Sequence, residues 1–275
     1  MVTEIDAIID AALEEDMPEG DITSESLIPA ESTSEAVFLA KEDGLLAGID
    51  VAFRVFFKID PQIEFRKHKQ DGFSIRTGET LAQIEGPSLS LLKGERTALN
   101  FLQRMSGIAT LTQKYVKAIE GTSAKILDTR KTTPSLRKLE KYAVKMGGGT
   151  NHRLNLSDMV MIKDNHLKIV GSISEAVKRA RERVGPHIKI EVETTTFEEV
   201  KEAVRAGADM IMLDNMSPER MKEVVDWVDG KVPLEASGNV TLETLKAIAS
   251  SGIDYISIGS LTHSYRSLDI SMEFL

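Results

Sequence analysis

The chain has 275 residues, of which 41% are hydrophobic and 28% charged, the composition of an ordinary globular protein. It contains no cysteine, which excludes disulfides, thiolate metal sites and a cysteine nucleophile. The net charge of −9 argues against a nucleic-acid-binding protein, and no apolar run approaches the length of a membrane span.

The first hundred residues predict a small α+β domain. Residues 4–16 carry apolar side chains at helical spacing, and Pro18 and Gly20 end this helix. Because the segment is acidic and amphipathic, it is not a signal peptide, and we expect a cytoplasmic protein. Residues 48–60 have the period of a second helix. Three segments alternate like strands and close in Asp-Gly or Glu-Gly turns: 34–44, 62–72 and 79–86.

The second half of the chain alternates strands with helices. Residues 89–120 predict a long helix with a break near Ser106-Gly107. Beyond it, short apolar runs that end in polar residues occupy 124–129, 158–164, 188–194, 209–215, 233–237 and 254–260. Amphipathic helices are predicted at 134–146, 172–184, 196–206, 217–228 and 241–251. The alternation implies a parallel sheet with right-handed crossovers. Without a Rossmann glycine fingerprint, it favours a (β/α) barrel with six such units; a doubly wound sheet is the second choice.

Polar residues follow every one of the six predicted strands. Helix caps also require Asp, Ser and Asn, but recurrence at all six ends indicates a shared site, because the sites of parallel barrels form there. The residues in question are 128–131, 163–166, Glu191 with Glu193, 214–215, Glu235 with 237–239, and 259–260.

The charges near these ends fall into separate groups. Residues 128–168 sum to +5 in a chain of −9, and this excess suits a small anion. Carboxylates or phosphates could be held by the cations Arg130, Lys131, Arg153 and Lys163, together with His152. By contrast, Lys138, Lys141 and Lys145 recur at helical spacing and predict a solvated helix face. The reading of His166 stays open between a site residue and an ordinary polar residue.

The remaining strand ends suggest a sugar phosphate. Glu193 and Asp214 offer hard oxygen ligands for Mg²⁺, directly or through water, or acceptors for sugar hydroxyls. The last two strand ends match the phosphate pocket of such barrels, with Ser237, Gly238, Asn239, Gly259 and Ser260. Together the groups predict a phosphorylated sugar that reacts with an acid.

At these residues the sequence resembles a known family. Residues 128–166, DTRKTTPSLRKLEKYAVKMGGGTNHRLNLSDMVMIKDNH, resemble quinolinate phosphoribosyltransferase, the carboxylating nicotinate-nucleotide pyrophosphorylase of NAD biosynthesis and a type II phosphoribosyltransferase. The resemblance extends to KGERTALNFLQRMSGIAT, IEVET, MLDN, EASGNV and DYISIGSLTHS, and so runs essentially end to end.

The resemblance implies a fold, a domain boundary and an assembly. The fold is an α/β protein with an incomplete (β/α) barrel and an N-terminal α+β sandwich domain. The sandwich would comprise residues 1–105, the barrel with the active site 106–265, and the tail 266–275 would pack on the sandwich. The family also implies a homodimer in which the N-terminal domain of one subunit closes the barrel of the other. A higher oligomer stays open, and no nucleic acid or membrane partner is expected.

The resemblance also implies roles for single residues. Arg130, His152, Arg153 and Lys163 would contact quinolinate, and Arg96 would enter the neighbouring subunit's site. Lys131 would lie between quinolinate and the pyrophosphate of phosphoribosyl pyrophosphate. Glu193 and Asp214 would lie on the ribose and Mg²⁺ side. The 5′-phosphate would be surrounded by Ser237, Gly238, Asn239, Gly259 and Ser260.

The implied reaction transfers the phosphoribosyl group to quinolinate with decarboxylation, giving nicotinate mononucleotide, pyrophosphate and CO2. The expected catalytic residues are Lys131, Glu193 and Asp214, with Mg²⁺ as cofactor. Two alternatives remain open: a paralogous transferase with another acceptor, and a non-catalytic sensor of a phosphate ligand.

Overall fold

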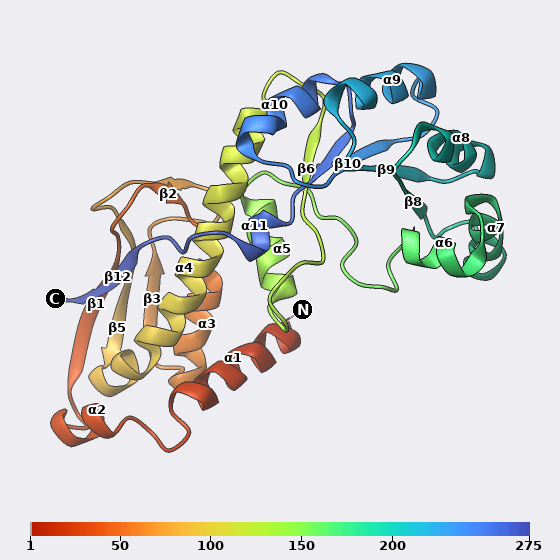
Figure 1. Ribbon diagram of the computed structural model, residues 1–275. Coiled ribbons are helices and arrows are strands. Elements are labelled where there is room, and N and C mark those ends of the chain that lie inside the picture. The colour runs from red at the N-terminus through yellow and green to blue at the C-terminus, as the bar shows by residue number, and fades with distance from the viewer. Residues whose placement is uncertain (1) are drawn as a thin grey trace. The chain divides into compact units, whose positions relative to one another are not determined.

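The alternating segments of the first hundred residues form strands, as predicted, in the computed structural model, which describes residues 2–275 (Figure 1). The chain divides into two units. Unit 1 comprises the chain up to Gln113, Thr133–Gly148 and Ser264–Leu275; unit 2 comprises Lys114–Thr132 and Gly149–His263. No helix within residues 2–275 is both long enough and apolar enough to cross a membrane.

Unit 1 is built on an antiparallel sheet with the strand order β12-β1-β5-β3. Its strands are β1 (Thr33–Ala40), β2 (Gly44–Leu45), β3 (Glu64–Lys67), β4 (Ser74–Ile75), β5 (Thr80–Pro87) and β12 (Ile270–Phe274). Its helices are α1 (Val2–Asp16), α2 (Ile22–Leu27), α3 (Ile49–Ile59), α5 (Arg137–Met146) and α4 (Ser88–Ala118), whose last turns belong to unit 2. The pair β2-β4 stands apart, and β12 brings the C-terminal tail beside β1.

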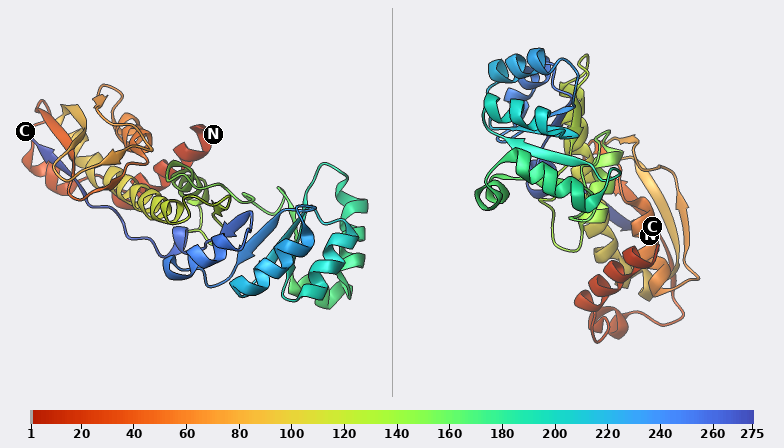
Figure 2. Two further views of the ribbon diagram at one scale, coloured as in Figure 1. Left: turned by 90° about the horizontal axis from the view of Figure 1, so that it is seen from above. Right: turned by 90° about the vertical axis from the view of Figure 1, so that its right-hand side faces the viewer.

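Aromatic side chains join α3 to this sheet. Figure 2 shows α3 and α4 against one face of it. The ring of Phe56 lies edge-on to that of Phe38, with centroids 6.0 Å apart, and Phe65 lies 5.7 Å from Phe38. Edge-on and tilted rings are the favoured arrangement of buried aromatic pairs. The period of two in the strands and 3.6 in α3 therefore directs the rings to one core.

The long helix α4 runs without interruption through Ser106-Gly107, so the predicted break is wrong. Gly107 does not interrupt the helix but allows a close backbone contact. A Cβ on Gly107 would lie 2.2 Å from the carbonyl oxygen of Arg266, so the missing side chain lets the backbone of the C-terminal segment approach the helix.

Replacing Gly107 by alanine should destabilise the protein. The new methyl group would meet backbone atoms that cannot rotate away, and we expect the free energy of unfolding to fall by about 1–3 kcal/mol. Urea denaturation measures the change. Asn100→Ala, at an exposed position on the same helix, should alter the free energy by less than about 0.5 kcal/mol. An equal response of the two variants would contradict the close approach.

The predicted solvated face of α5 is wrong for one of its three lysines. Lys141 is only 3% exposed, whereas Lys145 is exposed and Lys138 pairs with Glu4. The neighbouring Glu140 is fully buried and binds the guanidinium of Arg104. Helical spacing alone did not reveal that unit 1 covers this side of α5.

Unit 2 contains all six predicted parallel strands, in the order β6-β11-β10-β9-β8-β7. They are β6 (Lys125–Leu127), β7 (Val160–Ile162), β8 (Ile190–Thr194), β9 (Met210–Asp214), β10 (Leu234–Ser237) and β11 (Tyr255–Ser257). The helices are α6 (Asp164–Val170), α7 (Ile173–Val184), α8 (Phe197–Ala206), α9 (Pro218–Val228), α10 (Leu242–Ser250) and α11 (Ser260–His263). Helices α7 to α10 follow the outer side of the strands (Figure 1).

This sheet is an incomplete barrel. The strands follow one another in chain order from β7 to β11, and β11 then pairs with β6. A doubly wound sheet would reverse direction at a switch point, so that alternative is wrong. The barrel stays open between β6 and β7. The helix that separates these strands in the chain, α5, belongs to unit 1. Thr150 occupies the free edge of β6 through a single parallel bridge to Leu127.

Alternation along the barrel strands separates a helix-facing side from an interior side. On β8, Ile190 and Val192 are fully buried apolar residues, and Glu191 and Glu193 lie on the opposite side. Strand β10 repeats the pattern, with Glu235 and Ser237 opposite its apolar residues. The interior of this barrel is therefore polar, and it can hold a site as well as a core.

Candidate active site

A cavity of about 370 Å³ opens in unit 2 at the carboxyl ends of the barrel strands. Eight residues that the sequence predicted for the site line it: Arg130, Lys131, His152, Arg153, Lys163, Glu193, Asp214 and Ser237. They come from five different strand ends and from the segment after Thr150. The parallel sheet brings these distant segments together because all its strands end at the same edge.

The other predicted residues lie outside the lining. Gly238 and Asn239 follow β10, and Gly259 and Ser260 follow β11. The loop after β11 packs on the cavity wall, because a Cβ on Gly259 would lie 2.9 Å from Cδ of Lys131. Arg96 lies on α4 of unit 1 with an exposed side chain, which forms no hydrogen bond or ion pair within residues 2–275.

Five further residues line the cavity: Thr129, Met161, Met212, Glu235 and Ser257. Thr129 and Glu235 belong to strand ends that the sequence had marked. The other three precede Lys163, Asp214 and Gly259 by two positions each. Since side chains two apart on a strand point the same way, counting back from the strand ends would have found them. Met161 therefore belongs to the cavity wall.

The interior residues lie in layers. Met212 on β9 is the cross-strand partner of both Glu193 on β8 and Glu235 on β10. One pleat nearer the strand ends, Asp214 is level with Ser237. The carboxylates of Glu193 and Asp214 thus come from neighbouring strands and line the same cavity.

Two guanidinium groups dominate the cationic side of the cavity. Burial lowers the pKa of Arg153, and the neighbouring positive charge of Arg130 lowers it further. One terminal nitrogen of Arg153 donates to the carbonyl oxygen of Met159 at 3.0 Å, which fixes the direction of the side chain. An anion between the two arginines would relieve their repulsion and could be bound bidentately.

The carboxylate of Glu193 lies next to a third cation of the cavity, Lys163. The ammonium group of Lys163 donates to a carboxylate oxygen of Glu193. Lys163 is the N-cap residue of α6, and its backbone N–H donates to Nδ1 of His166 at 2.9 Å. His166 is therefore a helix-capping residue and does not line the cavity. Of the two alternatives for His166, the structure favours an ordinary polar residue over a site residue.

A chain of amide groups connects the loops after β9 and β10. Asn215 donates to Asp214 at 2.9 Å and accepts from the side chain of Asn239 at 3.1 Å. Gly238 has φ of +95°, and a Cβ there would lie 2.2 Å from Oδ1 of Asn215. Only glycine satisfies both demands, so the shape of this loop depends on it.

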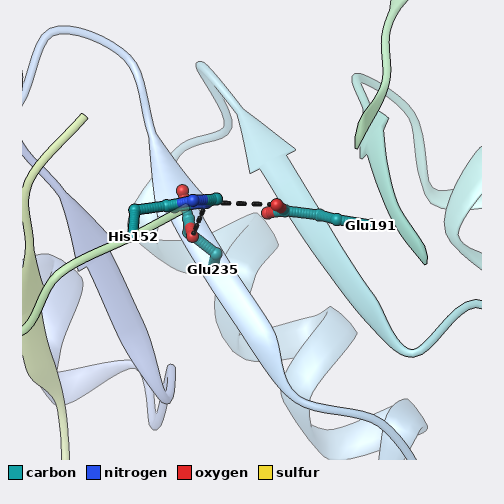
Figure 3. A group of neighbouring side chains, drawn as sticks. All are labelled: His152, Glu191 and Glu235. Atoms are coloured by element: carbon teal, nitrogen blue, oxygen red, sulfur yellow. Dashed lines mark ion pairs between the residues drawn. The ribbon is translucent and has the colours of Figure 1, made fainter. Parts of the chain in front are cut away.

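His152, which lines the cavity, lies between two carboxylates. Its Nε2 is 3.1 Å from Oε2 of Glu191 and 3.2 Å from Oε2 of Glu235 (Figure 3). The imidazole is 6% exposed and both glutamates are fully buried. Burial opposes a charge on the ring, but the two carboxylates outweigh it and raise the pKa of His152 to about 9.

An incomplete barrel that gathers four Lys/Arg side chains and three carboxylates around one cavity defines a protein that binds small anionic ligands at its strand ends. Residues 108–273 match the C-terminal domain, and residues 21–106 the N-terminal domain, of quinolinate phosphoribosyl transferase. The chain belongs to this family, and the resemblance read from the sequence is confirmed.

Two relatives show the extent of the similarity. The probable nicotinate-nucleotide pyrophosphorylase (carboxylating) of Bacillus subtilis is 48% identical over 259 residues, which cover 94% of this chain and 89% of that protein. The crystal structure of NadC from Streptococcus pyogenes is 42% identical, with a TM-score of 0.96 over 100% of this chain and 98% of that one. The predicted α/β fold class is likewise confirmed.

Proposed function

We propose that the protein transfers the phosphoribosyl group of phosphoribosyl pyrophosphate to quinolinate with decarboxylation. The products are nicotinate mononucleotide, pyrophosphate and CO2, and the pathway is de novo NAD biosynthesis. The observation that carries the proposal is the meeting of four Lys/Arg side chains with an acidic corner in one cavity, in a chain of the quinolinate phosphoribosyltransferase family.

The cationic side suits quinolinate, whose two adjacent carboxylates require several cations. Arg130 and Arg153 offer guanidinium groups close enough to repel each other, and Lys163 and His152 line the same cavity. In this proposal they hold the two carboxylates and thereby orient the pyridine nitrogen. Placing the reacting atoms in this way accounts for much of the expected rate enhancement.

The remaining predicted residues suit phosphoribosyl pyrophosphate. Lys131 stabilises the leaving pyrophosphate as a point charge, and Glu193 and Asp214 face the ribose. The loops that contain Ser237, Gly238, Asn239, Gly259 and Ser260 receive the 5′-phosphate. Arg96 reaches the site from the partner subunit of a homodimer. We place this enzyme in the cytoplasm.

The reaction then needs no general base. The pyridine nitrogen forms a bond to C1 of the ribose while the bond from C1 to the pyrophosphate breaks. The ring nitrogen becomes cationic, and the carboxylate at ring position 2 leaves as CO2. The electron pair of the broken bond stays on the ring carbon, which takes up a proton. The carboxylates of Glu193 and Asp214 stabilise the positive charge that develops on the ribose.

Mg²⁺ is the proposed cofactor, and the residues present fit it. Glu193 and Asp214 are two carboxylates on neighbouring strands that line one cavity, and Mg²⁺ in phosphate sites commonly uses one or two carboxylates plus substrate oxygens. When bound, the ion would neutralise negative charge on the pyrophosphate.

Gly238→Ala should weaken the binding of phosphoribosyl pyrophosphate selectively. The methyl group would displace Asn215 and the loop after β10, and a shift near 1 Å can cost up to about 100-fold in activity. Isothermal titration of each substrate measures the effect. Gly207→Ala, where φ is +79° but no atom lies within 4 Å, introduces the same type of backbone strain outside the cavity. Equal affinities in the two variants would contradict a role for this loop.

The function is tested by incubating the protein with carboxyl-labelled quinolinate, phosphoribosyl pyrophosphate and Mg²⁺. We expect labelled CO2 and nicotinate mononucleotide in equal amounts. Turnover with nicotinate in place of quinolinate, without CO2, would identify a paralogous transferase and overturn the proposal. Tight binding of phosphoribosyl pyrophosphate without turnover of any acceptor would instead indicate a sensor.

A further inference from the structure

Two fully buried glutamates flank His152 of the proposed quinolinate site. Glu191 on β8 and Glu235 on β10 are 0% exposed. Among the described residues, no donor lies in hydrogen-bonding geometry to their four carboxylate oxygens. Figure 3 shows the imidazole of His152 between them, with Nε2 3.1 Å from Oε2 of Glu191 and 3.2 Å from Oε2 of Glu235. Buried carboxylates are costly unless they are paired, so this group requires an explanation.

The three side chains have the composition of a metal site, with ligand atoms all within 4.8 Å of one another. The hydrogen bonding of His152 argues against that reading. Its Nδ1 accepts the backbone N–H of Arg153 at 2.7 Å, so the proton of the neutral ring is on Nε2. A nitrogen that carries a proton has no lone pair for a metal. Nε2 therefore carries a proton and lies near the two carboxylates as an electrostatic partner.

The ring of His152 connects the buried carboxylates to the backbone of Arg153. Residues 151–153 form no helix or strand, and side chains hold them in place. The backbone N–H of His152 donates to Oδ1 of the fully buried Asp128 at 2.9 Å. One ring nitrogen lies between the glutamates, and the other lies 2.7 Å from the Arg153 amide nitrogen, from which it accepts a hydrogen bond when the ring is neutral. Loss of one carboxylate would loosen the ring and with it the position of Arg153.

We propose that Glu191 and Glu235 are positioning residues, which act through His152 to fix Arg153 where its guanidinium receives a carboxylate of quinolinate. The inference rests on the proposed function. Glu191 is the cleaner case, because it does not line the cavity and can reach the substrate only through another residue. Glu235 touches the same cavity but makes the same contact with His152.

The test uses Glu191→Gln and Glu235→Gln in the full-length protein. Each keeps the shape of the side chain and removes its charge. We expect the dissociation constant for quinolinate to rise about 10- to 100-fold, the range typical of residues that orient a binding side chain. The affinity for phosphoribosyl pyrophosphate should change less than about twofold. Glu193 and Ser237 lie on the same strands as the two glutamates, but the contact that each variant alters is the one with His152, on the quinolinate side. Glu182→Gln, exposed on α7, serves as the matched control and should leave both affinities unchanged.

A double-mutant cycle identifies the route of the effect. In an Arg153→Ala background, Glu191→Gln should have little further effect on quinolinate binding, because the residue it positions is gone. Independent, additive losses would overturn the inference. So would an equal loss of affinity for both substrates, or a fall in thermal stability without a change in quinolinate affinity. If Glu191→Gln fails to fold, Glu235→Gln carries the same test.

A measurement without substrate separates this inference from the proposed function. The ring resonances of His152, assigned by their absence in His152→Gln, should titrate near pH 9 in the natural protein. Either glutamine variant should lower that midpoint, and Glu182→Gln should not. An unchanged midpoint would show that the glutamates do not hold the ring. The glutamine variants could lower the midpoint while the natural protein fails to turn over quinolinate. That result would support the positioning of His152 by Glu191 and Glu235 and refute only the proposed function.

Discussion

Arg153→Ala should abolish most of the affinity for quinolinate. The guanidinium is partly buried beside Arg130, with its direction set by the carbonyl oxygen of Met159. Truncating one partner of a buried charged hydrogen bond costs about 2–5 kcal/mol, or roughly 30- to 5,000-fold in the dissociation constant. The affinity for phosphoribosyl pyrophosphate should remain. Isothermal titration with each substrate measures both quantities.

Three controls make this result specific. Arg153→Lys keeps the charge but loses the fork of donors, so its affinity should fall between those of the natural protein and the alanine variant. Arg179→Ala removes an exposed arginine that pairs with Glu175 on α7 and should have no effect. Circular dichroism checks the fold. Unchanged quinolinate affinity in a normally folded Arg153→Ala protein would refute the role of Arg153 in binding quinolinate.

Arg96→Ala should inactivate the enzyme although its own cavity residues are intact. The side chain is exposed on α4 and has no partner within residues 2–275, as expected of a residue that serves the partner subunit's site. Mixing this variant with Arg153→Ala, after subunit exchange, should restore activity. In a symmetric dimer, half of the random pairs are hybrids and each has one complete site, so about a quarter of the natural activity should return.

The recovery depends on exchange, which has to be verified. Differently tagged subunits, mixed and captured through one tag, show whether hybrids form. Arg96→Ala mixed with itself provides the blank. Hybrids without recovered activity would refute the shared site and leave the dimer in place. Full activity of Arg96→Ala alone would show that the residue is not part of the machinery.

Most of the elements could be predicted from the sequence, because each has a local cause. Alternation of two in 34–44 and 79–86 placed β1 and β5, and all six parallel strands of unit 2 follow their apolar runs. The break at Ser106-Gly107 was wrong because a glycine can serve a close approach as well as an interruption. Lys141 was placed on the surface because helical spacing does not say which side another element covers.

Most of the cavity lining could also be predicted, from the residues at the strand ends. Eight predicted residues line it, because residues directly after parallel strands meet at one edge of a sheet. The contact of His152 with Glu191 and Glu235 was not predicted. Glu191 and Glu193 have the same chemistry and face the same side of β8, so the sequence does not tell which one is buried against a histidine 39 positions earlier in the chain.

The sequence by itself determined the repeating strand and helix pattern, the family, and the chemical types gathered at the strand ends. Each of these depends on neighbours a few positions apart, or on motifs that remain continuous along the chain. Only the tertiary structure decided three features. The barrel opens between β6 and β7, buried carboxylates hold residues 151–153 in place, and Lys163 pairs with Glu193. Those features depend on the distance and burial of groups far apart in the chain, which are set when the sheet forms.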